Sequence, residues 1–350
     1  MPASPARRRL GLLDFRPHAG AHRVALRAGV SVLVPLLVIA SIDRPEWTMF
    51  AAFGAFTSLY GRNHVHLSRA AMQLSAGATL VLCVVAGSAV TLLPHPAWVA
   101  VALSGLVAAG AASLALAQDW HPPGSLFPVF AFGACAAVAH APCDLVPALA
   151  VSGLSALFSM SVGAVGNLWK AQSSRPPRVR FHRTWLPLLD LTAVVAAGAI
   201  PTATSIGHPY WATVAAVAPL SARGITGQVT KALQRVLGTV AGLLTSAALL
   251  ALDLRGLVLL LVIAALQVGA ELLVGRNYGV AMLCVTPLAL LMGQAAQPRP
   301  PADLLFDRGV ETDHRCGGRR RGRAGSTPAA QPQGRRSVRC SGTRAGADLG

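Results

Sequence analysis

Long apolar segments recur along most of this chain, and they constrain its fold more than any motif does. Apolar windows of about 20 residues follow one another from Val24 to Leu291, and a helix needs about that length to cross roughly 30 Å of hydrocarbon. Charged residues make up 12% of the chain and the mean hydropathy is +0.54, whereas a soluble domain carries about 25% charged residues. Most of the chain is therefore expected to lie in a lipid bilayer.

Because lipid offers no hydrogen-bond partners to the backbone, these segments are expected to be helices rather than irregular chain. Their many Ala, Gly and Ser residues suit close helix packing, and the short alternating segments of an outer-membrane barrel are absent from the pattern. We predict an all-α polytopic transmembrane bundle. The predicted spans, about eleven in number, are 24–42, 47–60, 72–93, 98–117, 126–140, 145–168, 185–205, 210–222, 233–252, 257–273 and 278–292.

A loosely repeated segment divides these spans into two halves. PEWTMFAAFGA begins at Pro45 and PYWATVAAVAP begins at Pro209, and each leads into a basic turn and another apolar run. We therefore expect two transmembrane repeats of up to six helices, at 24–170 and 185–312, with the last helix of the second repeat missing. The basic turns and the polar or small residues that follow them are Arg62, Arg69, Gln73 and Gly77 in the first half, and Arg223, Lys231, Gln234, Arg235 and Gly238 in the second.

Arginine and lysine are distributed unevenly among the predicted loops, which sets the expected orientation. They are frequent in residues 1–23, after the second span and in the linker 171–184, but absent from the loop around Pro94 to Pro96. By the positive-inside rule, segment 1–23 and the linker are cytoplasmic. No small-residue cleavage site follows a short apolar core, so we expect the first span to remain as an anchor. We predict a multi-pass protein of the inner (plasma) membrane.

The carboxy-terminal segment 313–350 differs from the rest of the chain. It is rich in Arg, Gly, Ser and Pro and has no apolar periodicity, which is typical of a disordered basic tail. The change comes where the first half predicts a sixth span, so we hypothesise a frameshift near Thr312. The alternative is a genuine tail that contacts anionic lipid. Resequencing of the coding DNA distinguishes the two, since an intact frame with the same tail in independent isolates would exclude the frameshift.

The basic turn of the second half is the strongest candidate for a substrate path. Its polar and small residues lie at helical offsets on one face, which is cationic at its cytoplasmic end and suits a carboxylate. Arg69, Gln73 and Gly77 form the corresponding stripe in the first half. The alternative is that the cations only reach to lipid headgroups and the glycines only pack helices. The residues of the second-half face are Lys231, Gln234, Arg235, Gly238 and Gly242.

Other candidates carry less of the argument. Glu271 is an ionisable residue within a predicted span, close to Arg276, and such residues are often functional. Trp47, Tyr210 and Trp211 suit either an aromatic substrate surface or interfacial anchoring, and Asn277 and Thr286 are possible hydrogen-bonding residues along a path. No metal-ligand spacing, Walker loop, dinucleotide fingerprint or nucleophile elbow is present. We therefore expect no cofactor, no metal and no enzymatic activity, and the net charge of +17 reflects topology rather than nucleic-acid binding.

With these residues in view, the chain resembles the FUSC family of fusaric-acid-resistance and aromatic-acid-exporter-like membrane transporters. The resemblance is strongest over residues 231–239, KALQRVLGT, and extends to Pro209-Tyr210-Trp211 before it and to Asp307-Arg308 and Glu311-Thr312 after it. The first half departs from this pattern, with Leu74 where the second half has Arg235.

The resemblance implies proton-coupled or passive export of organic, often aromatic, acid anions through the inner membrane. It also implies a homo-oligomer and possible efflux partner subunits. A passive anion channel and a non-transporting scaffold are the alternatives, and the scaffold predicts that neutralising Arg235 or Arg69 leaves every solute flux unchanged.

Overall fold

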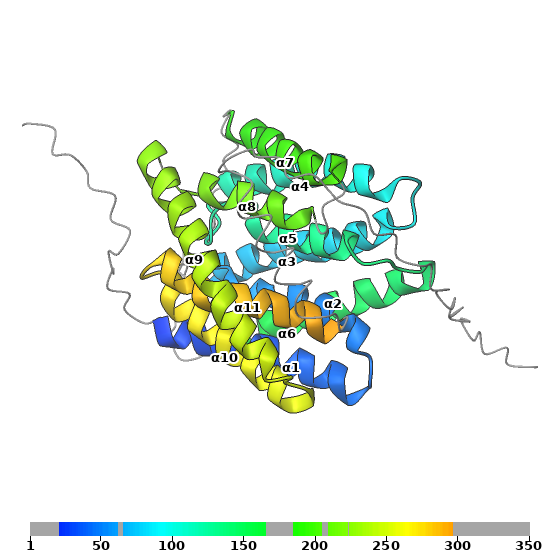
Figure 1. Ribbon diagram of the computed structural model, residues 1–350. Coiled ribbons are helices and arrows are strands. Elements are labelled where there is room, and N and C mark those ends of the chain that lie inside the picture. The colour runs from blue at the N-terminus through cyan, green and yellow to red at the C-terminus, as the bar shows by residue number, and fades with distance from the viewer. Residues whose placement is uncertain (1–20, 62–65, 166–184, 205–208, 223, 297–350) are drawn as a thin grey trace, which may run out of the picture. The chain divides into compact units, whose positions relative to one another are not determined.

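The computed structural model describes residues 21–61, 66–165, 185–204, 209–222 and 224–296, and helices dominate this part of the chain (Figure 1). The α-helices are α1 Ala21–Ser41, α2 Thr48–Ala55, α3 His66–Val90, α4 Pro96–Ala117, α5 Leu126–Ala136, α6 Leu145–Val165, α7 Leu186–Ala203, α8 Tyr210–Leu220, α9 Ile225–Ala251, α10 Gly256–Val274 and α11 Tyr278–Ala296. Short 3-10 helices are η1 Pro45–Trp47, η2 Phe56–Leu59 and η3 Pro142–Asp144. The predicted all-α class is confirmed.

Each predicted span corresponds to a helix, but not every helix is long enough to cross a bilayer. Eight of the described helices have the length and apolar composition of a membrane span. The other three, α2, α5 and α8, have 8, 11 and 11 residues, so these three of the eleven predicted spans are too short for a full crossing. Short helices of this kind are tolerated in lipid where neighbouring helices shield their ends.

Two helix starts were predicted too late. α3 begins at His66 rather than Met72, and α9 begins at Ile225 rather than Leu233. In both helices the first turns carry polar and basic side chains, which an apolar window excludes although the backbone is already helical. The candidate residues from Arg69 to Gly77 and from Lys231 to Gly242 therefore lie within regular helix.

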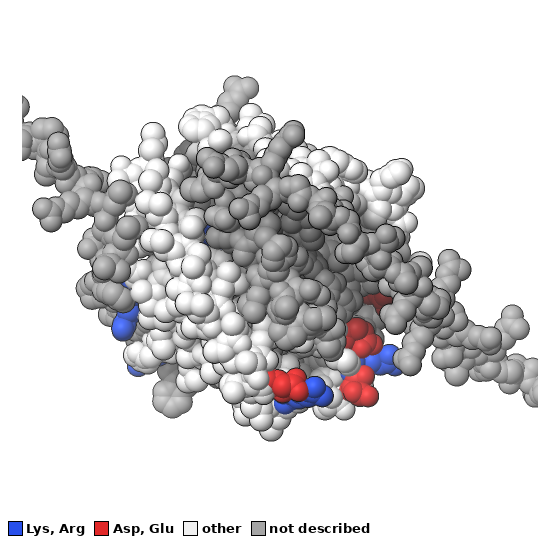
Figure 2. Space-filling model, viewed as in Figure 1, with Lys and Arg blue, Asp and Glu red and all other residues white. Residues whose placement is uncertain are grey.

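The outward faces of the long helices are apolar. Leu82 of α3, Leu154 of α6 and Leu244 of α9 expose 67%, 68% and 73% of their surface, which would be unfavourable in water and is expected against lipid tails. In Figure 2 most of the visible charged residues lie at the left margin and along the lower edge of the face.

Helix contacts repeat between the halves. α3 packs against α5 as α9 packs against α11, and α1 packs against α2 as α7 packs against α8. The pairing also crosses between halves, since α1 packs against α10 and α7 packs against α4. This reciprocal pattern is what two copies of one unit related by a pseudo-two-fold axis would produce.

The buried faces of α3 and α9 establish which residues correspond. Each fully buried residue of α9 has a buried residue of α3 at the position 162 residues earlier. Arg235 thus corresponds to Gln73, and Lys231 to Arg69. The sequence-based pairing of Arg235 with Leu74 is wrong, because Leu74 is 59% exposed and Arg235 only 7%. The buried pairs are Gln73/Arg235, Ala76/Gly238, Gly77/Thr239, Leu80/Gly242, Val84/Ser246 and Ser88/Leu250.

The sixth helix of the first half, α6, packs tightly against α2 and α3. A Cβ added to Gly54 of α2 would lie 2.2 Å from the carbonyl oxygen of Ser152, and one added to Gly163 would lie 3.0 Å from Oε1 of Gln73. Ser159 Oγ also donates to the Ala55 carbonyl oxygen at 3.1 Å. Among the described residues, no helix takes the same place against α8 and α9.

Several sequence-based expectations lie outside the described residues. They concern the amino-terminal segment before residue 21, the linker 171–184, the end of the second repeat and the tail 313–350. Arg62 and Arg223 also lie outside. The domain boundaries and the frameshift hypothesis therefore stay predictions.

Candidate functional site

A cavity of about 370 Å³ lies at the end of the bundle where α9 and α11 begin. It is enclosed by α5, α8, α9, α10 and α11, with η2 contributing one side. Its polar and charged lining comes mainly from the second half, and its aromatic lining mainly from the first. The polar lining residues are His121, Ser221, Lys231, Arg235, Gln267, Glu271 and Tyr278, and the aromatic ones are Phe56, Phe127, Phe130 and Trp211.

Two cations of α9 form one wall of this cavity. Lys231 and Arg235 are four residues apart and therefore point to the same side of the helix. Lys231 Nζ donates to Ser221 Oγ at 2.6 Å and lies 5.0 Å from the centre of the Tyr278 ring. Arg235 Nη1 donates to the Tyr278 hydroxyl at 2.7 Å. Tyr278 thus fixes both cations at the cavity wall.

A polar pair of α10 faces these cations. Gln267 and Glu271 are 2% and 5% exposed, and Gln267 Nε2 donates to Glu271 Oε1 at 3.5 Å. Glu271 is the one carboxylate among the described lining residues, against the two cations of α9. Charges interact strongly where the surroundings are apolar, so the excess of positive charge suits a bound anion.

The opposite wall is built from aromatic rings. Phe56 and Phe127 lie 5.5 Å apart at 65°, and Phe130 and Trp211 lie 5.4 Å apart at 37°. Rings at such distances leave faces and edges against which a further aromatic ring packs favourably. The cavity therefore combines an anion-attracting wall with a surface suited to an aromatic or apolar group.

The first-half stripe does not reach this cavity. Arg69 Nε donates to the Gly61 carbonyl oxygen at 3.0 Å, and Gln73 Nε2 donates to the Tyr60 carbonyl oxygen at 3.2 Å. A Cβ added to Gly77 would lie 3.0 Å from Thr57. These residues close a turn and pack helices, so the structure does not bring the two predicted stripes to one path.

The remaining residues of the α9 stripe are packing residues. A Cβ added to Gly238 would lie 2.4 Å from the Gly279 carbonyl oxygen, and one added to Gly242 would lie 2.7 Å from the Met282 carbonyl oxygen. These two glycines let α9 and α11 approach closely. Gln234 lies against Gly279 rather than in the cavity lining.

The weaker candidates have separate positions. Trp211 lines the cavity, whereas Trp47 lines a small cavity of about 80 Å³ elsewhere. Asn277 Oδ1 accepts a hydrogen bond from the Val280 backbone N–H at 3.1 Å, at the start of α11. Thr286 is fully buried beside Gly242. Of these four, only Trp211 belongs to the candidate site.

The sequence pattern does not predict Gln267, Tyr278 and Ser221 as residues of the site. Gln267 and Glu271 are four residues apart in an otherwise apolar helix, and that spacing was a usable signal for a polar pair facing inward. Tyr278 begins a span and was treated only as its boundary. Ser221 follows α8 in a turn, and nothing in the sequence indicates that Lys231 reaches it.

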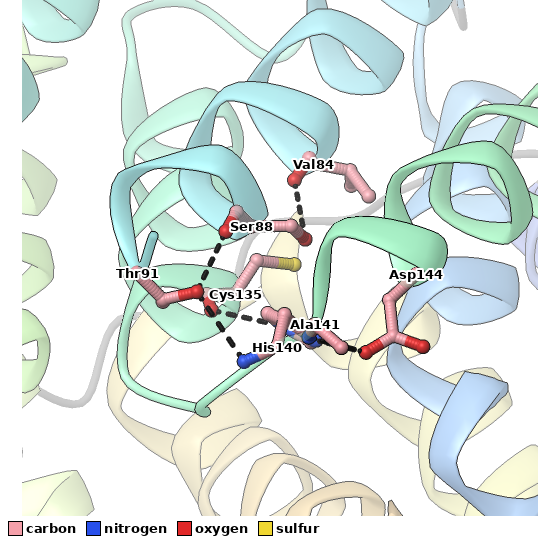
Figure 3. A network of polar contacts seen from close by, with 7 residues as sticks. All are labelled: Val84, Ser88, Thr91, Cys135, His140, Ala141 and Asp144. Carbon is pink, nitrogen blue, oxygen red and sulfur yellow. Dashed lines mark hydrogen bonds and ion pairs between the residues drawn. The ribbon is translucent and has the colours of Figure 1, made fainter. Parts of the chain in front are cut away.

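A second polar network lies where α3 ends and α6 begins (Figure 3). Ser88 Oγ donates to the Val84 carbonyl oxygen at 3.0 Å, and the His140 backbone N–H donates to Thr91 Oγ1 at 3.3 Å. His140 Nε2 donates to the Cys135 carbonyl oxygen at 3.2 Å, with Nδ1 4.0 Å from Asp144 Oδ2. Burial lowers the pKa of His140, and Asp144 opposes that shift. The network ties α3, α5 and α6 together.

Part of the second half matches a known family. Residues 195–312 match the family described as fusaric acid resistance protein-like, and this range contains Lys231, Arg235 and Glu271. The chain is also 27% identical over 157 residues to the uncharacterized membrane protein YvaC of Bacillus subtilis (strain 168). That match covers 44% of this chain and 24% of the relative, so it spans about a quarter of the relative's length.

No solved structure matches the chain significantly. The family match instead stands beside the fold, in which eight described helices have the length and composition of membrane spans. Together these findings describe a helical membrane protein whose residues 195–312 are similar to the fusaric acid resistance protein-like (FUSC) family.

Proposed function

We propose that this protein transports organic acid anions, with aromatic carboxylates as the favoured class, and that the cavity at Lys231 and Arg235 is where the anion binds. The observation that carries the proposal is the pairing, in one cavity of about 370 Å³, of two cations with a wall of four aromatic side chains. A carboxylate gains charge-assisted hydrogen bonds from the first wall. Its ring gains packing from the second.

The size of the cavity supports a small substrate. Ligand sites for small molecules typically have volumes of about 300–1,000 Å³, so a cavity of about 370 Å³ suits a substrate of one or two rings. Tyr278 contacts both cations and holds them in position before the anion arrives, which reduces the entropy lost on binding.

The proposal includes direction and location. We infer that the anion leaves the cytoplasm across the inner membrane. The amino terminus is placed in the cytoplasm because loops rich in Arg and Lys favour the cytoplasmic side. Glu271 supplies a carboxylate of the cavity lining that can exchange a proton as the anion binds and leaves. A homo-oligomer and efflux partner subunits belong to the proposal without a surface assigned to them.

The test measures efflux of radiolabelled benzoate, with aliphatic carboxylates beside it, from proteoliposomes that contain the full chain. Lys231→Gln and Arg235→Gln each remove one cation of the cavity wall and keep a polar side chain. The matched control is Arg276→Gln, which removes an exposed cation between α10 and α11 that does not line the cavity. We expect a loss of roughly tenfold or more for the two cavity variants, since a hydrogen bond to a charged group contributes about 1.5–3 kcal/mol.

The outcomes separate three functions. Efflux that collapses with the proton gradient supports an exporter, and efflux that persists down the anion gradient alone supports a passive channel. Unchanged flux in both cavity variants, at normal protein levels, would exclude this cavity as the path. Absence of flux for every anion in the wild-type chain would favour a scaffold.

A further inference from the structure

A second cavity, of about 420 Å³, lies near the start of α4. Its walls include Ala100 and Ser104 of α4, Gly133 and Ala137 at the end of α5, and Tyr210 and Thr213 of α8. None of the described residues that line it is charged. It differs in this respect from the cavity at Lys231.

The same two short helices separate the two cavities. Phe127 and Phe130 of α5 line the Lys231 cavity, whereas Gly133 and Ala137 line the second one. Ten residues of helix between Phe127 and Ala137 correspond to about 15 Å. The chain of α8, which packs against α5, likewise passes from one cavity to the other, with Tyr210 on the second and Trp211 on the first.

Three aromatic side chains fill the space between the cavities. Tyr210 and Trp211 lie 4.7 Å apart, Phe130 and Trp211 5.4 Å, and Phe130 and Tyr210 6.3 Å with nearly parallel rings. A Cβ added to Gly133 would lie 2.6 Å from the Tyr210 Cβ, so the glycine lets Tyr210 sit directly against α5. We call Phe130, Tyr210 and Trp211 the aromatic barrier.

Three hydroxyl groups of the second cavity already donate hydrogen bonds within the protein. Thr91, Ser104 and Thr213 each donate at 2.7 Å to a backbone carbonyl oxygen of their own helix or turn. A carboxylate that enters this cavity therefore meets no cation among the described lining residues and few available donors. An aromatic ring still finds apolar walls, so binding there is expected to be weak.

We propose that the second cavity is a low-affinity site for the aromatic carboxylate, reached across the aromatic barrier from the Lys231 cavity and used for its release. The inference rests on the proposed transport function and extends it. A path that binds tightly at one end and weakly at the other lets a substrate both enter and leave. Movement of the Tyr210 and Phe130 rings is the step that connects the two sites.

The test fills the second cavity after folding, so that a folding defect cannot produce the result. The full chain with Ala137→Cys is purified, treated with benzyl methanethiosulfonate and reconstituted beside the untreated protein. The matched control is Ala102→Cys with the same reagent, because Ala102 is exposed on α4 and does not line the cavity. Treated wild-type chain controls for the native cysteines, including exposed Cys143.

Two quantities are measured for each protein, namely efflux of radiolabelled benzoate and its equilibrium binding. We expect treated Ala137→Cys to lose efflux by roughly tenfold while its benzoate affinity changes less than about twofold. A second variant, Tyr210→Ala, is expected to raise passive benzoate leak severalfold because it thins the barrier.

The opposite results have distinct meanings. Normal efflux from treated Ala137→Cys would overturn the second site, although the Lys231 cavity would stand. Loss of binding together with efflux would overturn the separation of the two cavities. A wild-type chain that neither binds nor transports benzoate would overturn the proposed function, and this inference with it.

Discussion

The two halves of the protein share a helix arrangement but differ at its polar centre. In the first half, Gln73 is sealed between Tyr60 and Gly163. In the second half the corresponding residue is Arg235, and it lines a cavity of about 370 Å³. The first half is closely packed at this position, whereas the second half has a cation beside a cavity.

A further difference lies between α10 and α4, its counterpart in the reciprocal pairing. α10 presents Gln267 and Glu271 to the cavity, whereas the buried residues of α4 are Ala, Gly, Ser and Val. α4 therefore offers no buried counter-charge to a cation. The helix arrangement that the two halves share is therefore not enough to create the site. The site depends on the charged side chains and the cavity of the second half.

The largest expected effect comes from adding a cation to the first half at the position that corresponds to Arg235. Gln73→Arg introduces a cation at a position that is 2% exposed and touches Gly163, where no cavity receives it. An unpaired buried charge is strongly unfavourable, and removal of one partner of a buried pair already costs about 3–5 kcal/mol. We expect almost no folded protein, measured as the monodisperse fraction in detergent by size-exclusion chromatography.

The control for this exchange is Gln73→Met, which keeps the length of the side chain and removes its polarity. It loses one hydrogen bond to the Tyr60 carbonyl oxygen and should lower the folded fraction only moderately. Equal yields of Gln73→Arg and wild type would show that the first half has room for a cation, and would remove the contrast between the halves.

The next effect concerns the glycines that pack α9 against α11. In Gly238→Ala the new methyl group meets the Gly279 carbonyl oxygen at 2.4 Å, and backbone cannot move aside as a side chain can. Overpacking of this kind costs about 1–3 kcal/mol. We expect a clear fall in the apparent melting temperature of the purified chain.

Two other glycines allow the size of this fall in melting temperature to be compared with the space around each glycine. In Gly77→Ala the methyl group meets the Thr57 side chain at 3.0 Å, so the fall should be smaller. In Gly110→Ala it meets nothing within 4 Å, and alanine is favoured over glycine in a helix by roughly 0.5–1 kcal/mol. An equal fall in the melting temperature of all three variants would mean that the effect of Gly238→Ala does not come from close contact between α9 and α11.

Glu271 offers a smaller and more specific test. Glu271→Gln removes the carboxylate of the cavity lining and keeps the volume, which increases the excess of positive charge around a bound anion. We expect benzoate to bind about threefold to tenfold more tightly, as coupling between neighbouring charges typically amounts to 0.5–3 kcal/mol. If Glu271 exchanges the proton, efflux by this variant also loses its response to the proton gradient.

The matched control is Gln267→Glu, which adds a carboxylate one helical turn away. It should weaken benzoate binding by a similar factor. Affinities that do not change in either variant, measured by equilibrium binding to the purified chain, would show that the anion does not contact this wall.

Much of the fold was predictable because its determinants are local. Apolar run length predicted the helices and their order, and the repeated Pro-aromatic segments before the basic turns predicted two related halves. The starts of α3 and α9 were missed because their first turns are polar. A hydrophobicity window does not recognise such turns as helix.

The site was only partly predictable, because its geometry depends on register and on distant contacts. A shift of one residue rotates a position by about 100° around a helix, which is why the pairing of Arg235 with Leu74 failed. Lys231, Arg235 and Glu271 were identified from their own helices. Their assembly with Tyr278 and Phe127 requires several helices to be placed in space, and no spacing in the sequence encodes that.

A sequence similarity bears on the end of the second half. The sixth helix of the first half is entered through Pro142-Cys143-Asp144-Leu145, and Pro301-Ala302-Asp303-Leu304 repeats this pattern after α11. This similarity of sequence is consistent with the hypothesis of a frameshift near Thr312, which stays a prediction. Efflux by a chain with the frame restored after Thr312, compared with this chain, measures what the altered segment contributes.

The smallest expected effect is a pH dependence at His140, in the network at the far end of the first half. Its ring lies 5.4 Å from that of Phe50, and burial lowers its pKa against the opposing effect of Asp144. The unfolded chain, with a histidine pKa of about 6.5, then binds a proton more readily than the folded protein does. The contribution of His140 to stability is therefore present above that pH and declines as the pH falls below it.

For the pH dependence at His140, we expect an apparent melting temperature about 1–2 °C lower one pH unit below this value than one unit above it. His140→Gln should abolish that difference and the exposed control His95→Gln should retain it, whereas a difference that survives in His140→Gln would assign it to another group.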